Sequence, residues 1–349
     1  MCSSQRGMPT SPLKADTFSI DDKVAFLSHP ANYPDQPDHV DVIETHMSWV
    51  FLTPTDVYKL KKPIQIDGLD YSTLDARQAD CENEVMLNQR LAAKVYLGML
   101  PLTIDSQGNI QINGEGNTVE WLVHMRRLPT EQMLDQAIKN QTVDLKLLRD
   151  AAICLCQFYT RAPHVKISPN TYRESIKKRI DAIANQLIKQ QYALPQRLVD
   201  VIRKNLNQFL GHYSMLLDER VQQQYIIEVH GDLRPEHICL TEPPMIIDCL
   251  EFSEELRCQD PLDELAYFSI ECEMLGADEI GAFFLEYYKK QNHDRAPDIL
   301  FDFYRSFRAF LHAYLAARHL DDDPQQTRKD WTKQAKHLLQ LAEKYSLRW

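Results

Sequence analysis

The sequence predicts an α+β protein with two lobes: a small, mostly antiparallel β-rich lobe with one helix, and then a larger helical lobe. Three observations support this prediction. β-branched and aromatic runs bounded by turn residues dominate the chain before Pro129. Helical periodicity dominates after Pro129, and a single β-rich island at residues 226–248 interrupts it. We expect an arm with a short helix over residues 1–35, the β-rich lobe over 36–128 and the helical lobe over 129–349.

The β-rich lobe contains five predicted strands and one long helix. A short helix near residues 20–28 precedes them. Ser72, with Asp75 three residues later, predicts a capping box at the start of the long helix. The strands are expected at residues 49–52, 57–61, 100–104, 110–112 and 118–125, and the long helix at 74–93.

The helical lobe shows apolar residues at helical spacing over seven segments, and prolines stand at several of their starts. These segments are residues 131–160, 172–192, 195–220, 261–275, 278–291, 298–320 and 325–346.

The composition excludes several routes to function. The 10 glycines among 349 residues are under half of the usual share of about 7%. The glycine-marked nucleotide loops GxGxxG and GxxxxGK[ST] are both absent. A formal charge of −11 argues against nucleic acid or an anionic membrane as the main partner.

Location is predicted from apolar runs and cysteines. No apolar run approaches the roughly 18 residues that span a bilayer, and the first residues show no export signal. The eight cysteines lack CxxC spacing, which is typical of reduced thiols. We therefore expect a cytoplasmic protein without a membrane or nucleic-acid partner.

The β-rich island brings candidate site residues together. A tight turn at residues 241–244 would pair residue 240 with residue 245, which sets His237 opposite Asp248. The loop that carries Asp232 leads into the same hairpin. The spacing thus predicts two metal-competent side chains beside a further carboxylate.

The island also carries a family resemblance. The run His230-Gly-Asp-Leu-Arg-Pro-Glu-His237, followed by Asp248 on the next strand, resembles the catalytic loop and metal-binding strand of aminoglycoside phosphotransferases and choline kinases. Protein kinases are more distantly similar. The resemblance implies a two-lobed protein-kinase-like fold. It places Asp232 at the catalytic aspartate, Asp248 at the Mg²⁺-binding aspartate, and Arg234 within reach of the γ-phosphate.

His237 departs from the family pattern, which has asparagine at this position. Neutral imidazole can bind a metal, but it suits hard Mg²⁺ less well than an amide oxygen does. The resemblance implies ATP and Mg²⁺ as cofactors, and the departure makes Mn²⁺ an alternative. His237 remains open as a metal ligand or an ordinary satisfied histidine, and His230 is expected to support its loop.

The first lobe offers a cation for the nucleotide phosphates. Alternation places Val57, Lys59 and Lys61 on one strand face. Glu84 lies on the apolar face of the predicted long helix, where a carboxylate requires a cation. By the resemblance, Lys59 with Glu84 positions the phosphates, as in the kinase V-A-x-K strand, and Lys61 remains the alternative.

Two further segments are similar to nucleotide-binding parts of the family. The last strand of the lobe leaves through a run that resembles the adenine-binding hinge, in which Arg126 and Leu128 would offer a carbonyl and an amide. Ser48 stands where glycines often cover the phosphates. Residues 45–52, 57–63 and 247–252 also look like an uncharacterised bacterial branch of phosphotransferase-like proteins.

These expectations define a function and two rivals. We expect an ATP-dependent phosphotransferase acting on a hydroxyl of a small molecule. Glu251, Glu254 and Glu255 would attract a cationic acceptor, or they form a solvated surface. One rival is a nucleotide-binding regulator of the pseudokinase type. The other is a metal-dependent hydrolase built on the histidines and aspartates of the island.

Overall fold

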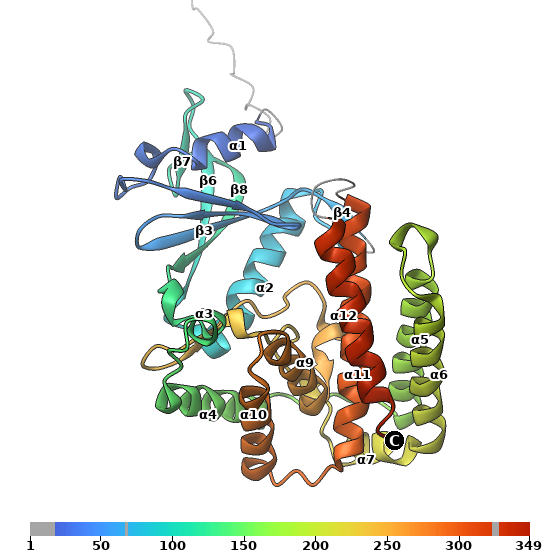
Figure 1. The fold of residues 1–349 in the computed structure, drawn as a ribbon. Helices are drawn as coiled ribbons and strands as arrows, with labels where there is room; N and C mark the ends of the chain where they lie inside the picture. The colour runs from blue at the N-terminus through green and yellow to red at the C-terminus, as the bar shows by residue number, and fades with distance from the viewer. Residues whose placement is uncertain (1–17, 67–68, 323–327) are drawn as a thin grey trace, which may run out of the picture. The chain divides into compact units, whose positions relative to one another are not determined.

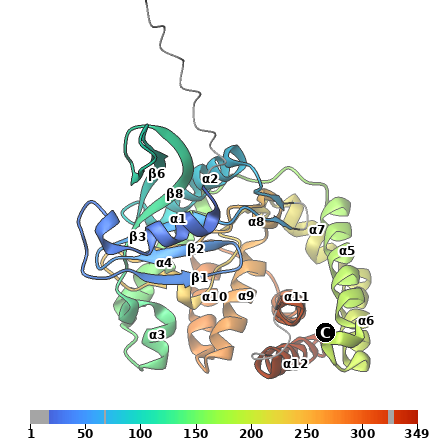
Figure 2. The ribbon, with the colours of Figure 1, turned by 90° about the horizontal axis from the view of Figure 1, so that it is seen from above.

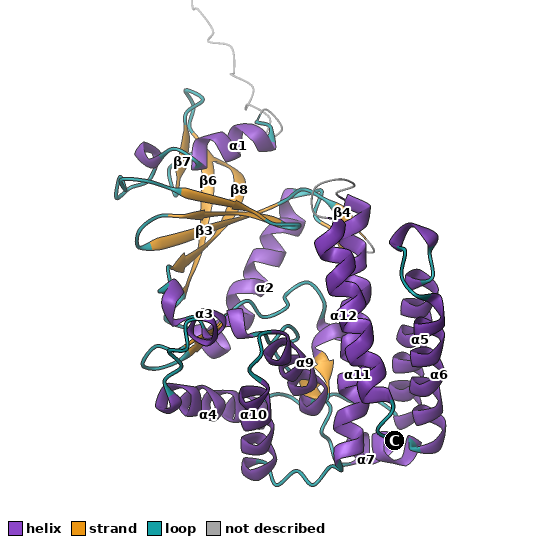
Figure 3. Ribbon diagram, in the orientation of Figure 1, coloured by secondary structure: helices purple, strands orange, loops and turns teal. Residues whose placement is uncertain are grey.

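The structure, a computed structural model, describes residues 18–66, 69–322 and 328–349. The chain divides into two compact units between Leu128 and Pro129. A six-stranded sheet lies in unit 1, whereas long helices dominate unit 2 (Figure 3). The predicted two-lobed α+β fold class is therefore confirmed. The first 17 residues of the expected arm lie outside the described residues.

The sheet of unit 1 is antiparallel, with strand order β1-β2-β3-β8-β6-β7. The five predicted strands all occur. The edge strand β1 was not predicted, because its four residues are all exposed and give no alternating pattern. The strands are β1 (Asp41–Glu44), β2 (Ser48–Leu52), β3 (Asp56–Lys61), β6 (Tyr96–Ile104), β7 (Ile110–Ile112) and β8 (Asn117–Arg126). A small separate hairpin joins β4 (Gln65–Ile66) to β5 (Leu69–Asp70).

A helix covers each face of this sheet. Helix α1 (Ile20–Leu27) places Leu27 in an apolar core with Tyr58 and Leu60 of β3. The alternate residues of β3 point to the other face, toward α2 (Leu74–Ala92).

The predicted capping box of α2 is wrong by one residue. The N-cap is Thr73, whose hydroxyl accepts the N–H of Ala76. The Ser72 hydroxyl instead donates to Asp70 at 2.5 Å, so it belongs to the preceding turn.

Unit 2 is built from helices, and the predicted segments 131–160 and 195–220 each divide into two. Asp144 caps the second helix of the first pair by accepting two backbone N–H groups. Helix α11 packs along α12, and α5 packs along α6 (Figures 1 and 2). The helices are α3 (Leu134–Lys139), α4 (Leu145–Arg161), α5 (Pro169–Leu187), α6 (Gln196–His212), α7 (Ser214–Gln222), α8 (Glu254–Arg257), α9 (Pro261–Met274), α10 (Asp278–Gln291), α11 (Asp298–Asp322) and α12 (Arg328–Ser346).

Helix α9 is the buried centre of unit 2. Its first ten residues are all buried, and Asp260 caps it by accepting the N–H of Leu262. Asp260 also pairs with Arg220 at 2.6 Å, so its part here is structural. None of the helices within the described ranges has both the length and the hydropathy to cross a bilayer.

Short strands connect these helices: β9 (Ile227–Glu228) pairs with β12 (Cys258–Gln259), and β10 (Ile238–Cys239) pairs with β11 (Met245–Ile246).

Candidate active site

Unit 1 presents one lysine from an apolar strand surface. Strand register places Lys59 beside Val123 of β8, and Val57 beside Met125. Residues paired directly across two strands share a face, so these side chains form one surface with Lys59. The three apolar residues are buried, whereas the Lys59 side chain keeps 15% of its exposure. The surface is therefore apolar, and Lys59 is the cation on it that solvent can reach.

Glu84 of α2 lies between both candidate lysines. Its Oε1 is 2.8 Å from Lys59 Nζ and its Oε2 is 2.5 Å from Lys61 Nζ. Lys61 also pairs with Asp80 at 2.8 Å. Asp80 and Glu84 are four residues apart, so they share a face of α2. The structure therefore brings the predicted Lys59 and Glu84 together, and it adds a second ion pair that the sequence did not indicate.

Ser48 lies at the start of β2, directly across from Lys61. It is fully buried, and its hydroxyl has no hydrogen-bond partner within the described part of the chain. Thr45 and Ser48 close the β1–β2 turn through a backbone hydrogen bond of 2.8 Å. The part that Ser48 plays toward a nucleotide stays a prediction.

At the end of β8, the backbone N–H groups of Arg126, Arg127 and Leu128 differ in whether they donate a hydrogen bond to the backbone. The N–H of Arg126 donates to Val95 and the N–H of Arg127 donates to Thr55. The N–H of Leu128 makes no backbone hydrogen bond among the residues described. The amide that the sequence assigned to adenine is therefore the one in this run that the local fold does not use.

In unit 2 the hairpin of β10 and β11 differs from the predicted register by one residue. The structure pairs Ile238 with Ile246 and Cys239 with Met245. The expected pairing of Leu240 with Met245 does not form, because the N–H of Leu240 donates instead to the carbonyl of Gln132 at 2.8 Å. The turn is consequently longer than the sequence predicted.

His237 and Asp248 nevertheless meet. His237 Nε2 lies 3.5 Å from Asp248 Oδ2, and His237 Nδ1 lies 3.8 Å from Asp232 Oδ2. Asp248 has a left-handed backbone conformation with φ of 61°, which is uncommon outside glycine although aspartate adopts it more readily than most residues. The three predicted side chains thus form one cluster.

A backbone contact sets the tautomer of His237. Its Nδ1 donates to the carbonyl of Asp232 at 2.8 Å. In the neutral ring, Nε2 then carries the lone pair and faces the Asp248 carboxylate. This is the orientation that a metal-binding histidine requires.

The pair fits a divalent cation as two of its ligands. A carboxylate oxygen and an imidazole nitrogen 3.5 Å apart can occupy neighbouring positions around one ion. Within the described ranges, no three His, Cys, Asp or Glu side chains are placed so that together they could hold one metal ion. Mg²⁺ commonly keeps waters and binds one or two protein ligands plus substrate phosphates, so a two-residue site is sufficient.

Glu264 of α9 holds the loop in place. Its carboxylate accepts the N–H of Gly231 at 2.5 Å and of His230 at 3.3 Å, and it accepts the hydroxyl of Tyr159 at 2.6 Å. Burial raises the pKa of Glu264 to about 7, although these hydrogen bonds lower it. His230 Nε2 donates to the carbonyl of Ile247 at 2.9 Å, which ties the loop to the segment carrying Asp248.

Gly231 is required by the backbone of this loop. Its φ is 89°, and an added Cβ would lie 3.0 Å from side-chain atoms of both Arg257 and Leu250. No other residue type fits without strain.

Arg234 lies between two glutamates. Its Nη2 is 2.6 Å from Glu236 and 3.5 Å from Glu271 of α9. Burial raises the pKa of Glu271 to about 7, whereas Arg234 lowers it. The guanidinium keeps about a third of its exposure, so it is held in place but accessible.

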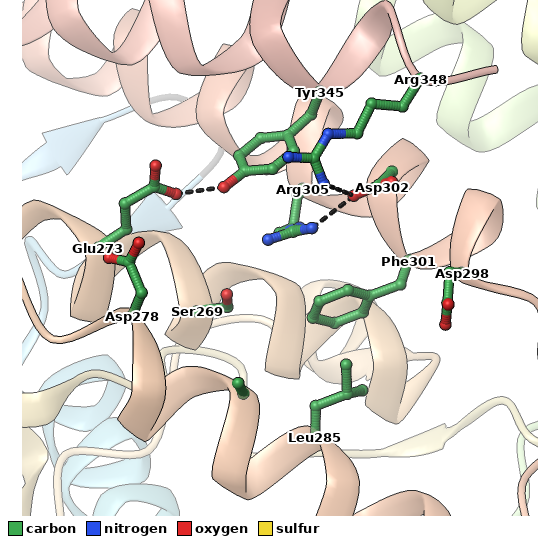
Figure 4. Close-up of a pocket in the computed structure, with 11 residues that line it drawn as sticks. Ser269, Glu273, Asp278, Leu285, Asp298, Phe301, Asp302, Arg305, Tyr345 and Arg348 are labelled. Carbon is green, nitrogen blue, oxygen red and sulfur yellow. Dashed lines mark hydrogen bonds and ion pairs between the residues drawn. The ribbon is translucent and has the colours of Figure 1, made fainter.

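A cavity of about 360 Å³ lies among α9, α10, α11 and α12 (Figure 4). Two of its acidic residues have partners: Glu273 pairs with Lys344, and Asp302 with Arg305. Tyr345 of α12 packs against the Arg305 guanidinium, whose central carbon lies 3.9 Å from the centre of the Tyr345 ring. No residue of the segment from His230 to Asp248 lines this cavity, and its contacts fix α12 to the rest of unit 2.

Solved structures with a similar fold are small-molecule kinases. An aminoglycoside 2′-phosphotransferase in a GDP complex superposes with a TM-score of 0.54 at 15% identity, covering 92% of this chain and 97% of its own. A choline/ethanolamine kinase family protein from Mesorhizobium loti gives 0.53 at 15%, covering 92% and 94%. A choline kinase from Cryptosporidium parvum gives 0.53 at 11%, covering 92% and 95%. This chain has the aminoglycoside phosphotransferase and choline kinase fold.

The curated relatives of this kinase-like chain are uncharacterised. Proteins from Mycobacterium tuberculosis and Mycobacterium bovis are 32% identical over 295 residues, which is 82% of this chain. The chain spans 56% of the length of these relatives. No family model matches it. The predicted likeness to the two kinase families is thus confirmed at the level of the fold.

Three residues of this kinase-like site were missed by sequence reasoning: Asp80, Glu264 and Glu271. Each is an acidic residue on a buried helix face. Glu264 and Glu271 lie in a helix that is otherwise mostly apolar. Burying a carboxylate costs free energy unless it has hydrogen-bond or ion-pair partners. An acidic residue on a buried helix face was therefore the signal in the sequence that could have identified these three residues.

Proposed function

We propose that this protein is an ATP-dependent phosphotransferase that transfers the γ-phosphate to a hydroxyl of a small molecule. The observation that carries the proposal is the clustering of Asp232, His237 and Asp248 on one loop and hairpin. The pair of Lys59 with Glu84 supports it independently. The similar solved structures, named as aminoglycoside and choline kinases, support the reaction class.

Unit 1 would bind the nucleotide. The apolar surface around Val57 and Met125 suits a purine ring, and the free amide of Leu128 with the carbonyl of Arg126 suits its edge. Lys59 would bind phosphate oxygens, with Glu84 fixing its position. Phosphoryl transfer depends mainly on such positioning and on electrostatics.

Unit 2 would carry out the transfer. Asp232 would accept the proton of the acceptor hydroxyl while the oxygen of that hydroxyl forms a bond to the γ-phosphorus. At the same time, the bond between the γ-phosphorus and the oxygen that bridges it to the β-phosphate breaks. ADP leaves with the electron pair of that bond, and Arg234 steadies the transferred group. Asp248 and His237 would hold Mg²⁺ or Mn²⁺, which neutralises charge on the phosphates.

The acceptor would be a small hydroxyl compound. A formal charge of −11 favours a cationic one. Nucleic acid and membranes are not part of this proposal as partners. A cytoplasmic location, where ATP is made and thiols stay reduced, is part of it.

The deciding experiment compares wild type with Asp232→Asn. ADP release is measured across amino sugars, amino alcohols and sugars, and nucleotide affinity is measured in parallel. We expect Asp232→Asn to lose about 10²–10⁴-fold in acceptor-dependent ADP release, with ATP affinity retained. Asp330→Asn, exposed on α12, is the control and should match wild type. Equal turnover by Asp232→Asn would overturn the assignment.

His237 supports a second candidate, a nucleotide-binding regulator without transfer activity. Imidazole in place of the family amide weakens the fit to Mg²⁺. Such a regulator would bind ATP with either Mg²⁺ or Mn²⁺ but release no ADP with any acceptor. The same screen therefore separates the two functions.

A further inference from the structure

Two lysines share one carboxylate in unit 1. Lys59 contacts Oε1 of Glu84 and Lys61 contacts Oε2, at 2.8 and 2.5 Å. Kinase chemistry requires one lysine at the phosphates, so the second one needs its own explanation.

Burial separates the two lysines. The Lys61 side chain is 1% exposed, against 15% for Lys59. Lys61 is also paired with Asp80, which accepts the hydroxyl of Tyr71 at 2.8 Å. Lys61 is therefore enclosed by fixed partners, and its ammonium group does not face solvent.

Two ammonium groups contact two carboxylates in this group, and all four side chains are largely buried. If Lys59 turns toward a phosphate, Glu84 still keeps one cation at 2.5 Å. Without Lys61, the same movement would leave a buried carboxylate unpaired, which costs several kcal/mol.

We propose that Lys61 is a positioning residue for nucleotide binding. It is the permanent partner of Glu84, and Asp80 fixes it there. It keeps Glu84 paired and in place while Lys59 binds the phosphates. This inference rests on the proposed function, and it assigns different parts to the two lysines that the sequence could not separate.

The first experiment removes Lys61 and Asp80 together. Lys61→Met/Asp80→Asn deletes one charge of each sign, so the net charge of the buried group is unchanged. Kd is measured for ATP and for adenosine, which has no phosphates. We expect ATP affinity to fall about tenfold and adenosine affinity to stay within about twofold.

The control is the neighbouring ion pair of Lys62 and Glu44, whose atoms are 2.6 Å apart. Lys62→Met/Glu44→Gln likewise removes one charge of each sign, from a more exposed pair on the same sheet, and both affinities should equal those of wild type. A purely structural part for Lys61 would lower both affinities of the double variant equally. That result, or unchanged ATP affinity, would overturn the inference.

The second experiment uses the wild-type protein, so it does not depend on folding of a variant. Lysines are labelled with an amine-reactive reagent, with and without ATP, and modified sites are read by mass spectrometry. We expect Lys59 to be labelled and then protected by ATP, and Lys61 to stay unlabelled in both samples.

The outcomes distinguish the two proposals. Labelling of Lys61 that ATP prevents would overturn the positioning role while leaving nucleotide binding intact. Absence of any ATP binding by wild type would remove the proposed function, and this inference with it.

Discussion

The charged clusters of the two units differ in how they are neutralised. In unit 1, Lys59, Lys61 and Glu84 are at most 15% exposed, and their contacts are 2.5 and 2.8 Å long. In unit 2, the side chains of Asp232 and Asp248 are 32% and 44% exposed, and their atoms lie 3.8 and 3.5 Å from His237. The first cluster is buried and closely paired, whereas the second is more exposed and its side chains are farther apart, which suits an added cation. Stability should therefore depend on the first and chemistry on the second.

The largest effect tests the more exposed cluster in unit 2. Asp248→Asn removes the charge but keeps a residue that tolerates the left-handed backbone. We expect turnover to fall about 10²–10³-fold, while the free energy of unfolding changes by less than about 0.5 kcal/mol. Steady-state kinetics and urea unfolding measure the two quantities. A large loss of stability with little loss of turnover would contradict the comparison.

The next effect tests the cluster of Lys59, Lys61 and Glu84 in unit 1. Glu84→Gln leaves two buried lysines with one carboxylate, so we expect a loss of about 3–5 kcal/mol in the free energy of unfolding. Glu82→Gln on the same helix is exposed and should change it by less than about 0.5 kcal/mol. Urea denaturation of both variants is the measurement. Equal stability of the two would show that the buried ion pairs contribute nothing.

A smaller effect concerns the backbone under the more exposed cluster in unit 2. Gly231→Ala places a Cβ 3.0 Å from Arg257 and Leu250 at a φ of 89°, which should cost about 1–3 kcal/mol. Gly211→Ala in α6 meets open space and should stabilise by up to about 1 kcal/mol. Thermal melts compare the two glycines. A stabilised Gly231→Ala would contradict the strain.

The smallest effect is a pH dependence. The pKa of Glu264 rises from 4.5 to about 7 on folding, so the folded protein binds the extra proton between these values. Its contribution makes stability fall as pH rises through this window, by at most about 1.4 kcal/mol per unit.

Glu264→Gln removes the contribution of Glu264 to this pH dependence. The contribution of Glu271 remains, because burial raises its pKa to about 7 as well. Unfolding free energies at pH 5, 6 and 7 should therefore fall less steeply in the variant. An identical slope would show that Glu264 does not titrate in this range.

Much of the fold followed from the sequence because its signals are local. Alternation fixed β3 with Val57 and Lys59 on one face, and proline with aspartate fixed the start of α9. The edge strand β1 lacked any buried face and was missed. The break between α6 and α7 at Tyr213 was also missed, although Gly211 two residues earlier is a residue type that often marks a helix end.

The candidate site divides in the same way. The family resemblance, which is carried by motifs of fixed spacing, selected Glu84, Asp232, Asp248 and Lys59 with Lys61 as its alternative, since such a motif needs no knowledge of distant contacts. The hairpin register was wrong because Gln132, more than a hundred residues before Leu240, takes its N–H. Such competition for a backbone donor is invisible in a local pattern.

The sequence by itself determined which residues carry charge and which element each lies on. Only the tertiary structure decided which charges meet, that Glu84 is shared by two lysines and that Glu264 holds the loop of Asp232. The physical reason is that ion pairing and burial depend on distances between segments far apart in the chain, whereas periodicity depends only on neighbours.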